Sequence, residues 1–166
     1  MRQLESISIR PISAEETPLL EEFTYWAIHI PQGETPPERS ILKEPFLRAL
    51  FEGFGSGAYD RAVVAHDGHE IIGIAWVRIC HSYGSVAPDI PELAISVLPD
   101  QRGRGVGMCL MQALLRLIDE DGVEKISLSV QKDNRAVRLY ERCGFTVLKE
   151  QETDFIMVRS HPSARA

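Results

Sequence analysis

The stretch "PDQRGRGVGMCLM", residues 99–111, decides the fold, because it joins an apolar run ending at Leu98 to another beginning at Val106. A glycine-rich turn between a strand and a helix presents free backbone N–H groups at the helix N-terminus, where the helix dipole adds positive potential. The stretch therefore predicts a strand, a turn and a helix that together bind an anion such as phosphate. The alternative is that the glycines only make a tight turn.

Two arginines in the turn favour the phosphate interpretation. Arg102 and Arg104 carry guanidinium groups, which can donate two parallel hydrogen bonds to phosphate oxygens as lysine cannot. Two familiar nucleotide loops do not match, however. The G-K-[ST] ending of a P-loop is missing, and Met108 stands where a dinucleotide fingerprint needs its last glycine.

Length and composition indicate one globular unit. The chain has 166 residues, of which 44% are hydrophobic and 25% charged, so we expect a single domain over 1–160 and a flexible tail over 161–166. No apolar leader and no membrane-length apolar window occur, which predicts a cytoplasmic protein without membrane contact. The net charge of −6 disfavours nucleic acid and favours a cationic partner.

Cysteine and histidine spacing gives no support for a disulfide framework or a metal site. Cys80, Cys109 and Cys143 are odd in number and far apart, so we expect three buried thiols. The five histidines lack the spacing of metal ligands, and no metal is predicted.

The first sixty residues predict one strand and two helices. Residues 6–13 alternate apolar and polar side chains up to a closing Pro11. Ser13 and Glu16 form a capping-box pattern ahead of apolar residues at helical spacing. A second helix is expected from about Glu38 to Phe54, with a kink at Pro45.

The remaining residues alternate between strands and helices. Asp67-Gly68 predicts a type I′ hairpin between two β-branched runs in residues 61–80. Further strands are expected at 92–98 and 125–131, helices from 106 to Gly122 and at 134–144, and a final strand pair at 145–160. This order predicts an α+β fold with a mixed sheet that contains one parallel pair.

Residues 134–145, "NRAVRLYERCGF", combined with the upstream "RGRGVG", resemble the GCN5-related N-acetyltransferase superfamily. In that family an R-x-x-G-x-G motif, matched here by Arg102, Gly105 and Gly107, binds the pyrophosphate of acetyl-coenzyme A. The resemblance is good over roughly residues 60–150, whereas the first sixty residues match only in outline. The later motif is matched by Asn134, Ala136, Leu139, Tyr140, Gly144 and Phe145.

The resemblance implies a fold and a cofactor site. It implies the acyl-CoA N-acyltransferase fold, a layered α+β arrangement in which a mixed, mostly antiparallel sheet of six to seven strands is flanked by about four helices. The parallel strands splay apart, and backbone near Val97 and Leu98 pairs with the pantetheine arm and donates an N–H to the thioester carbonyl. The expected cofactor-binding residues are Val97, Leu98, Arg102, Gly103, Arg104, Gly105, Val106, Gly107, Asn134 and Tyr140.

The resemblance also implies catalytic residues. Tyr140 would be the general acid at the sulfur, since an ordinary tyrosine pKa of about 10 suits protonation of a thiolate; the alternative is a core tyrosine. Glu92 would be the base, acting directly or through water; the alternative is a solvated carboxylate at a strand end. Side chains alternate along a strand, so the register decides whether the Glu92 carboxylate faces the cleft. Asn134 would bind the cofactor or cap its helix, roles that are compatible.

The predicted function is acetyl-CoA-dependent N-acetyl transfer to a primary amine of a small molecule or peptide, by direct transfer in a ternary complex. The alternative is a non-catalytic CoA or acetyl-CoA sensor. The acceptor site is expected from residues 22–60 and 81–91, whose aromatic side chains would form either a pocket or core, with Glu34 or Glu38 attracting the cation. Exposed edge strands near the C-terminus would allow a homodimer.

Overall fold

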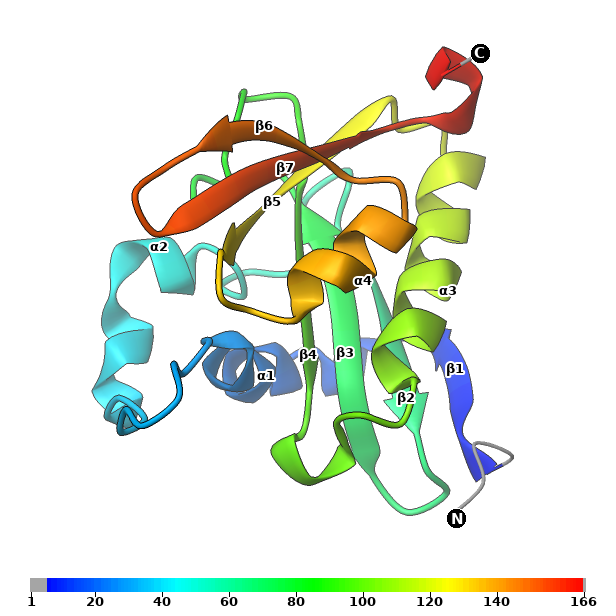
Figure 1. Cartoon of the computed structure of the whole chain (residues 1–166). Coiled ribbons are helices and arrows are strands. Elements are labelled where there is room, and N and C mark those ends of the chain that lie inside the picture. Colours follow the sequence, from blue (N-terminus) through cyan, green and yellow to red (C-terminus); the bar gives the residue numbers. More distant parts are fainter. Residues whose placement is uncertain (1–5, 166) are drawn as a thin grey trace.

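The computed structural model describes residues 6–165, which form one seven-stranded sheet in the order β1-β2-β3-β4-β5-β7-β6 (Figure 1). Only β4 and β5 run parallel, while all other neighbours are antiparallel. The predicted mixed, mostly antiparallel sheet with one parallel pair is therefore confirmed. The strands are β1 (Ser8–Pro11), β2 (Arg61–His66), β3 (Ile71–Arg78), β4 (Glu92–Val97), β5 (Lys125–Gln131), β6 (Thr146–Glu150) and β7 (Asp154–Ser160).

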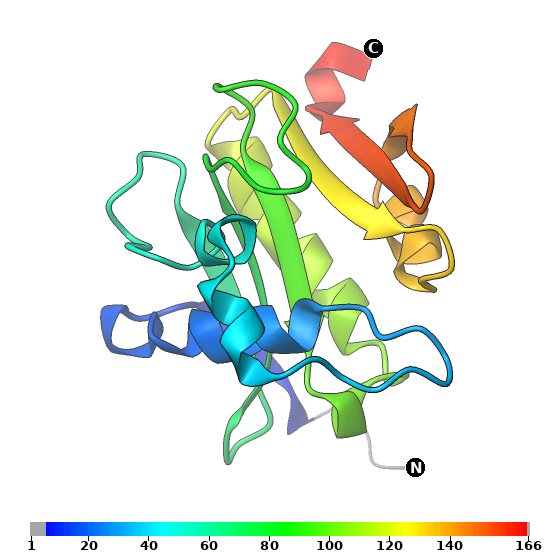
Figure 2. The same ribbon diagram turned by 90° about the vertical axis from the view of Figure 1, so that its left-hand side faces the viewer.

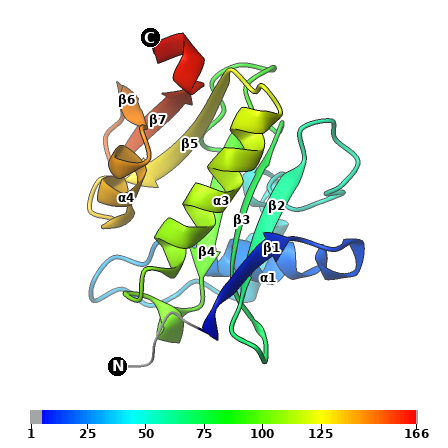
Figure 3. The same cartoon turned by 90° about the vertical axis from the view of Figure 1, so that its right-hand side faces the viewer.

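Helices cover both faces of the sheet. On one face lie α1 (Leu19–Ala27) and α2 (Pro45–Arg48), seen in front of the strands in Figure 2. On the other face lie α3 (Val106–Glu120) and α4 (Ala136–Arg142), as Figure 3 shows. Each face has its own apolar core, since period-2 alternation in the central strands sends side chains to both sides.

The parallel pair is joined at one position only. Glu92 is in register with Ser127, and the Ser127 N–H donates to the Pro91 carbonyl over 2.9 Å. Past this point β4 and β5 diverge toward their C-terminal ends, which Figure 2 shows as a widening gap. The sheet therefore has an opening between two strands that are both central in its order.

The glycine-rich stretch makes the predicted turn into α3. Gly103 and Gly105 have φ of 77° and 81°, values that residues with a side chain rarely adopt, and α3 begins directly after Gly105. The helix then runs with its apolar stripe on the sheet until a left-handed Gly122 (φ 74°) follows its end.

The second predicted helix is broken. A 3₁₀ turn covers Arg39–Lys43 and α2 starts afresh at Pro45, instead of one helix running from Glu38 to Phe54. The reason is the proline ring, which disfavours helical backbone in the residue before it; Glu44 is accordingly extended, with ψ of 130°. Glu44 then caps α2 by accepting the N–H of Leu47.

The first helix also starts later than its capping box suggests. Ser13 and Glu16 do form the box, but it opens a short 3₁₀ turn (Ala14–Glu16), and α1 begins only after Pro18. Glu16 is held in addition by Arg10, which donates to both of its oxygens.

The hairpin turn differs from the predicted type. Asp67 N–H donates to the Glu70 carbonyl over 3.1 Å, so the two central residues are Gly68 and His69. Gly68 has φ of 98° and no non-glycine residue of the described chain has a positive φ. Glycine in the first central place and a negative φ in the second are typical of a type II′ turn and not of type I′.

The described residues that follow β7 continue in contact with the rest of the chain. His161 N–H donates to Glu124 O over 2.7 Å, and Pro162–Arg165 form a 3₁₀ turn. Cys80, Cys109 and Cys143 are free thiols but only half-buried. None of the described helices is long and apolar enough to cross a bilayer.

Candidate functional site

A cavity of about 370 Å³ opens where β4 and β5 diverge. Its walls come from α1 and the loop after it, from α2, from the loop between β3 and β4, and from β4, β5, α4 and β7. The cavity therefore meets both faces of the sheet. The polar and titratable residues along it include His29, Ser82, Tyr83, Glu92, Ser129, Gln131, Asn134, Tyr140 and Asp154.

The register of β4 decides which side chains meet the cavity from which face. Leu93 and Ile95 pack on the α3 side with the larger core, whereas Ala94 packs on the α1 side. Glu92 shares the face of Ala94 and lines the cavity from the α1 side. The carboxylate is thus not a solvated strand-end group, since Glu92 is only 4% exposed.

Backbone donors hold the Glu92 carboxylate. Its Oε1 accepts the N–H of Gly84 over 2.8 Å and its Oε2 accepts the N–H of Ser82 over 3.0 Å, with the Cys80 thiol at 3.5 Å. Burial raises the pKa of the Glu92 carboxyl, while the two backbone hydrogen bonds oppose that shift. A buried carboxylate with a raised pKa in a cavity is a candidate general base.

A close approach brings the donor loop to this carboxylate. A Cβ on Gly84 would lie 2.7 Å from the Leu128 carbonyl carbon and from the Ser129 nitrogen, so no other residue fits there without a backbone shift. The hydroxyl of Ser127 donates to the Gly84 carbonyl over 2.8 Å, and that of Ser82 donates to Phe46 O over 2.7 Å. The loop is therefore anchored to β5 and α2 at once.

Tyr140 reaches the same cavity from α4, on the opposite face of the sheet. Its side chain is 8% exposed and packs edge-on against Phe145, with ring centroids 5.9 Å apart. Within residues 6–165 its hydroxyl makes no hydrogen bond. Burial raises the pKa of the phenol above its ordinary value, so Tyr140 stays protonated and can donate a proton into the cavity.

The open edge of β4 supplies backbone donors. The Leu98 N–H was expected from the sequence to donate to the thioester carbonyl. In the structure this N–H donates to Ile72 O over 2.9 Å, so it is not free for that contact. Antiparallel pairing alternates, and the same rule turns the N–H groups of Ile95 and Val97 away from β3, toward the gap. Of the two predicted backbone positions, Val97 keeps a free donor and Leu98 does not.

The start of α3 offers a second group of free donors. The first helical hydrogen bond runs from Cys109 N–H to Gly105 O over 3.2 Å, which leaves the N–H groups of Val106, Gly107 and Met108 without a helical acceptor. A Cβ on Gly107 would lie 3.4 Å from the Leu139 side chain, so α4 closes this end of the gap. Free donors at a helix N-terminus, together with the helix dipole, are suited to binding an anion.

Arg102 is engaged with the protein itself. Its Nε donates to Val97 O over 2.9 Å and its Nη2 donates to Trp26 O over 2.8 Å. In this arrangement the guanidinium joins the end of α1 to the end of β4 and is not turned to the anion site as a two-pronged donor. Arg104 likewise donates to Gln101. Both arginines therefore donate to groups of the protein itself.

The side chain of Asn134 contacts the backbone at the start of α4. Its Oδ1 accepts the N–H of Ala136 over 2.9 Å at the start of α4, and the side chain also lines the cavity. Beside it, His29 Nε2 lies 3.1 Å from Asp133 Oδ1, a contact between the loop after α1 and the turn before α4.

Some cavity residues were not expected from the sequence. The aromatic side chains of the expected acceptor region could form either a pocket or core; of them only Tyr83, with His29, lines the cavity, and Phe23 is core. Glu34 and Glu38 are not among the lining residues. Asp154, the first residue of β7, was missed, because only its pairing with Gln131 of β5 places it at the cavity.

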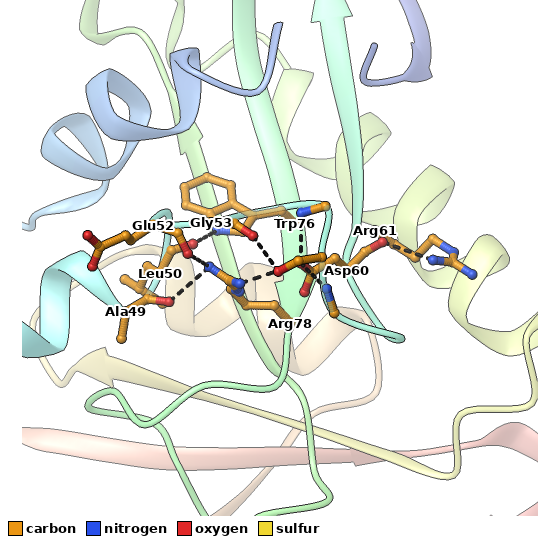
Figure 4. Close-up of polar contacts among 11 residues, drawn as sticks. Ala49, Leu50, Glu52, Gly53, Asp60, Arg61, Trp76 and Arg78 are labelled. Atoms are coloured by element: carbon orange, nitrogen blue, oxygen red, sulfur yellow. Dashed lines mark hydrogen bonds and ion pairs between the residues drawn. The ribbon is translucent and has the colours of Figure 1, made fainter. Parts of the chain in front are cut away.

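A buried ion pair supports the wall formed by α2. Arg78 Nη1 donates to Glu52 O over 2.7 Å, and its Nη2 lies 3.4 Å from Asp60 Oδ2 (Figure 4). The indole of Trp76 donates to Leu50 O over 2.9 Å. These contacts fix the segment whose Leu50 faces the cavity.

Comparison with known proteins identifies the family to which the chain is similar. Residues 21–145 match the acetyltransferase (GNAT) family. A mycothiol acetyltransferase of Pseudarthrobacter chlorophenolicus is 30% identical over 86% of this chain and 43% of its own length. One from Corynebacterium glutamicum is 40% identical over 72% of this chain and 46% of its own length. The chain thus spans about half the length of these curated relatives.

Solved structures agree in fold. The PaiA N-acetyltransferase from Thermoplasma acidophilum, crystallised with coenzyme A, superposes with a TM-score of 0.66 at 21% identity, covering 93% of this chain and 99% of that one. A GCN5-related N-acetyltransferase from Kribbella flavida gives 0.65 at 19% identity, covering 95% and 99%. The expected acyltransferase fold is confirmed.

Proposed function

The chain belongs to the acetyltransferase (GNAT) family, and from this premise we propose that it transfers an acetyl group from acetyl-CoA directly to the primary amine of a small molecule. One observation carries the proposal. The buried carboxylate of Glu92 and the side chain of Tyr140, whose hydroxyl makes no hydrogen bond within residues 6–165, line one cavity, at the point where β4 and β5 separate. A base and an acid at one reaction centre are what amine acylation needs.

The residues present fit acetyl-CoA. The free N–H groups of Val106, Gly107 and Met108 would hold its pyrophosphate, and the free N–H of Val97 would pair with the pantetheine arm. Gly103 and Gly105 keep the loop free of side chains. The cofactor supplies an acetyl group activated as a thioester.

The chain's own residues handle the protons. Glu92 accepts the proton that the acceptor ammonium must lose, directly or through a water, and its raised pKa brings its basicity closer to that task. Tyr140 holds a proton for the departing thiolate. The N–H groups of Ile95 and Val97 face the gap and stabilise negative charge on a carbonyl oxygen there.

A two-stage experiment tests this function. Thermal unfolding is first followed with acetyl-CoA, CoA, NADH and ATP in parallel; a ligand at about a hundred times its Kd adds about 2.7 kcal/mol of stability. We expect only the two CoA species to stabilise the protein. Release of CoA thiol is then measured with acetyl-CoA and a panel of small amines. Stabilisation without thiol release from any amine would indicate a CoA sensor instead of an enzyme.

A further inference from the structure

The charges that face the cavity are unbalanced. Two carboxylates, Glu92 and Asp154, line it, and among the described residues no lysine or arginine does. The one imidazole, that of His29, lies 3.1 Å from the carboxylate of Asp133. The cavity therefore presents negative potential and has no cation that could receive a carboxylate or phosphate on the acceptor.

The two carboxylates lie at opposite ends of a polar stripe. On β5, Ser127, Ser129 and Gln131 share one face, while Ile126, Leu128 and Val130 face the core. Glu92 is in register with Ser127 at one end of this stripe, and Asp154 is in register with Gln131 at the other.

The length of the stripe follows from strand geometry. Four residues along a strand span roughly 13 Å, so Glu92 and Asp154 approach the stripe from positions separated by about that length. Tyr140, whose hydroxyl makes no hydrogen bond within the described residues, lines the same cavity. An acceptor that places its reacting amine near Glu92 and Tyr140 would therefore extend its other end toward Asp154.

Asp154 is available for such a contact. The hydrogen bond recorded for its carboxylate is from the neighbouring Thr153 hydroxyl, at 3.2 Å, and it enters no ion pair within the described residues. The cation on the adjoining strand end, Lys132, is instead engaged with Glu150 at 2.8 Å.

We propose that the acceptor is a small aliphatic diamine, whose second ammonium group binds Asp154 while the first is acetylated beside Glu92 and Tyr140. This inference rests on the proposed function and adds the substrate class. Asp154 is accordingly a specificity-determining residue, placed by the pairing of β7 with β5. An amine carrying a carboxylate at its far end would be repelled by the same group.

Four probes of equal chain length test the proposal: pentane-1,5-diamine, 5-aminopentan-1-ol, pentylamine and 5-aminopentanoate. Initial rates of CoA thiol release give kcat/KM for each. We expect pentane-1,5-diamine to exceed pentylamine by about tenfold or more, which is about 1.4 kcal/mol, and 5-aminopentanoate to be the poorest. The differences in kcat/KM between the probes should become smaller as ionic strength rises, because the discrimination is electrostatic.

Two variants show whether Asp154 is responsible. Asp154→Asn should lower kcat/KM for the diamine about tenfold more than for pentylamine. Glu152→Gln removes the same charge two residues away, from an exposed position that does not line the cavity, and should leave the order unchanged. Circular dichroism and acetyl-CoA binding of both variants check that the fold is kept.

The outcomes separate the two proposals. If kcat/KM for 5-aminopentanoate equals that for the diamine, or if Asp154→Asn lowers kcat/KM for all four probes equally, the diamine class is wrong. The acetyltransferase function then still stands. If none of the probes releases CoA thiol and other small amines also fail, the proposed function fails and the diamine class fails with it. A wider screen that finds only monoamines acetylated would likewise overturn the diamine class.

Discussion

The backbone N–H of Gly84 lies 2.8 Å from Glu92 Oε1, so the loop between β3 and β4 fixes the carboxylate before any substrate arrives. Gly84 itself is wedged against β5, where a Cβ would meet the Leu128 carbonyl carbon at 2.7 Å. The position of the candidate base therefore depends on a residue that has no side chain.

Adding a methyl group at that position tests the dependence. Gly84→Ala forces the loop away from β5 and should lower the free energy of unfolding by about 1–3 kcal/mol. Because Glu92 also loses its backbone donor, kcat/KM should fall by more than this destabilisation alone would cause. Ser85→Ala, on the next residue, is the control and should be near neutral. Denaturant unfolding and initial rates measure both. A Gly84→Ala protein with wild-type kcat/KM would show that the clamp on Glu92 is unimportant.

Removing one hydroxyl tests the candidate acid. Tyr140→Phe keeps the buried ring and its contact with Phe145, so acetyl-CoA affinity should be unchanged while kcat falls about 10²-fold or more, the usual effect of losing a general acid. Tyr59→Phe makes the same change at an exposed position and should have no effect. Isothermal titration and steady-state kinetics separate binding from turnover. An unchanged kcat would remove Tyr140 from the mechanism.

A matched pair of glycine substitutions tests the anion site. Gly105→Asp and Gly33→Asp each place a negative side chain at a left-handed position, φ 81° and 85°, so both should lose about 1–2 kcal/mol of stability. Only Gly105→Asp puts the charge at the start of α3, and only it should lose the thermal shift with acetyl-CoA. Retained binding by Gly105→Asp would refute the phosphate site.

Two aspartate–arginine ion pairs that differ in burial test the support of the cavity wall behind α2. Asp60 forms a buried pair with Arg78, with side chains 2% and 10% exposed (Figure 4). Asp121, in contrast, pairs with Arg61 at the surface. Asp60→Asn leaves Arg78 without its counter-charge and should cost about 3 kcal/mol or more, while Asp121→Asn should cost less than about 1 kcal/mol. Equal losses in urea unfolding would contradict this account.

The pH dependence follows from burial of Glu92. Because its pKa is raised in the folded protein, the ionised form needed by a base appears at higher pH than for an ordinary glutamate, and kcat/KM should rise through that shifted pKa. The free energy of unfolding should change in the opposite direction with pH. The stability that protonated Glu92 contributes is complete below its pKa in the unfolded chain and is lost as pH rises through its pKa in the folded protein. Glu92→Gln should remove both trends, and an unaltered acidic limb in the Gln variant would assign it to another group.

The sequence predicted the part of the fold in which local pattern and packing agree. The structure contains the three predicted features near the gap between β4 and β5: the turn into α3, the alternating strand "ELAISV" and the helix that carries Tyr140. Prediction failed where neighbours in sequence override the pattern: Pro45 breaks the second helix through Glu44, and the hairpin centres on Gly68 and His69.

The candidate site could be predicted only in part. Which face Glu92 meets depends on register with β3 and β5, and no property of residue 92 itself reveals that Gly84 and Ser82 hold its oxygens. Arg102 was expected to bind phosphate by its residue type, yet its donors reach Val97 and Trp26, the second of which lies far away in sequence. Long-range hydrogen bonds of this kind have no local signal.

The single register pair between β4 and β5 has a consequence for amide hydrogen exchange. Beyond Glu92 and Ser127 the backbone donors of Ile95 and Val97 have no strand partner, although β4 lies in the middle of the sheet order. Their amides should exchange with solvent at rates typical of a sheet edge, while those of Ala94 and Ser96, turned toward β3, are protected. A bound molecule that takes the place of the missing strand would slow exchange at Ile95 and Val97 first.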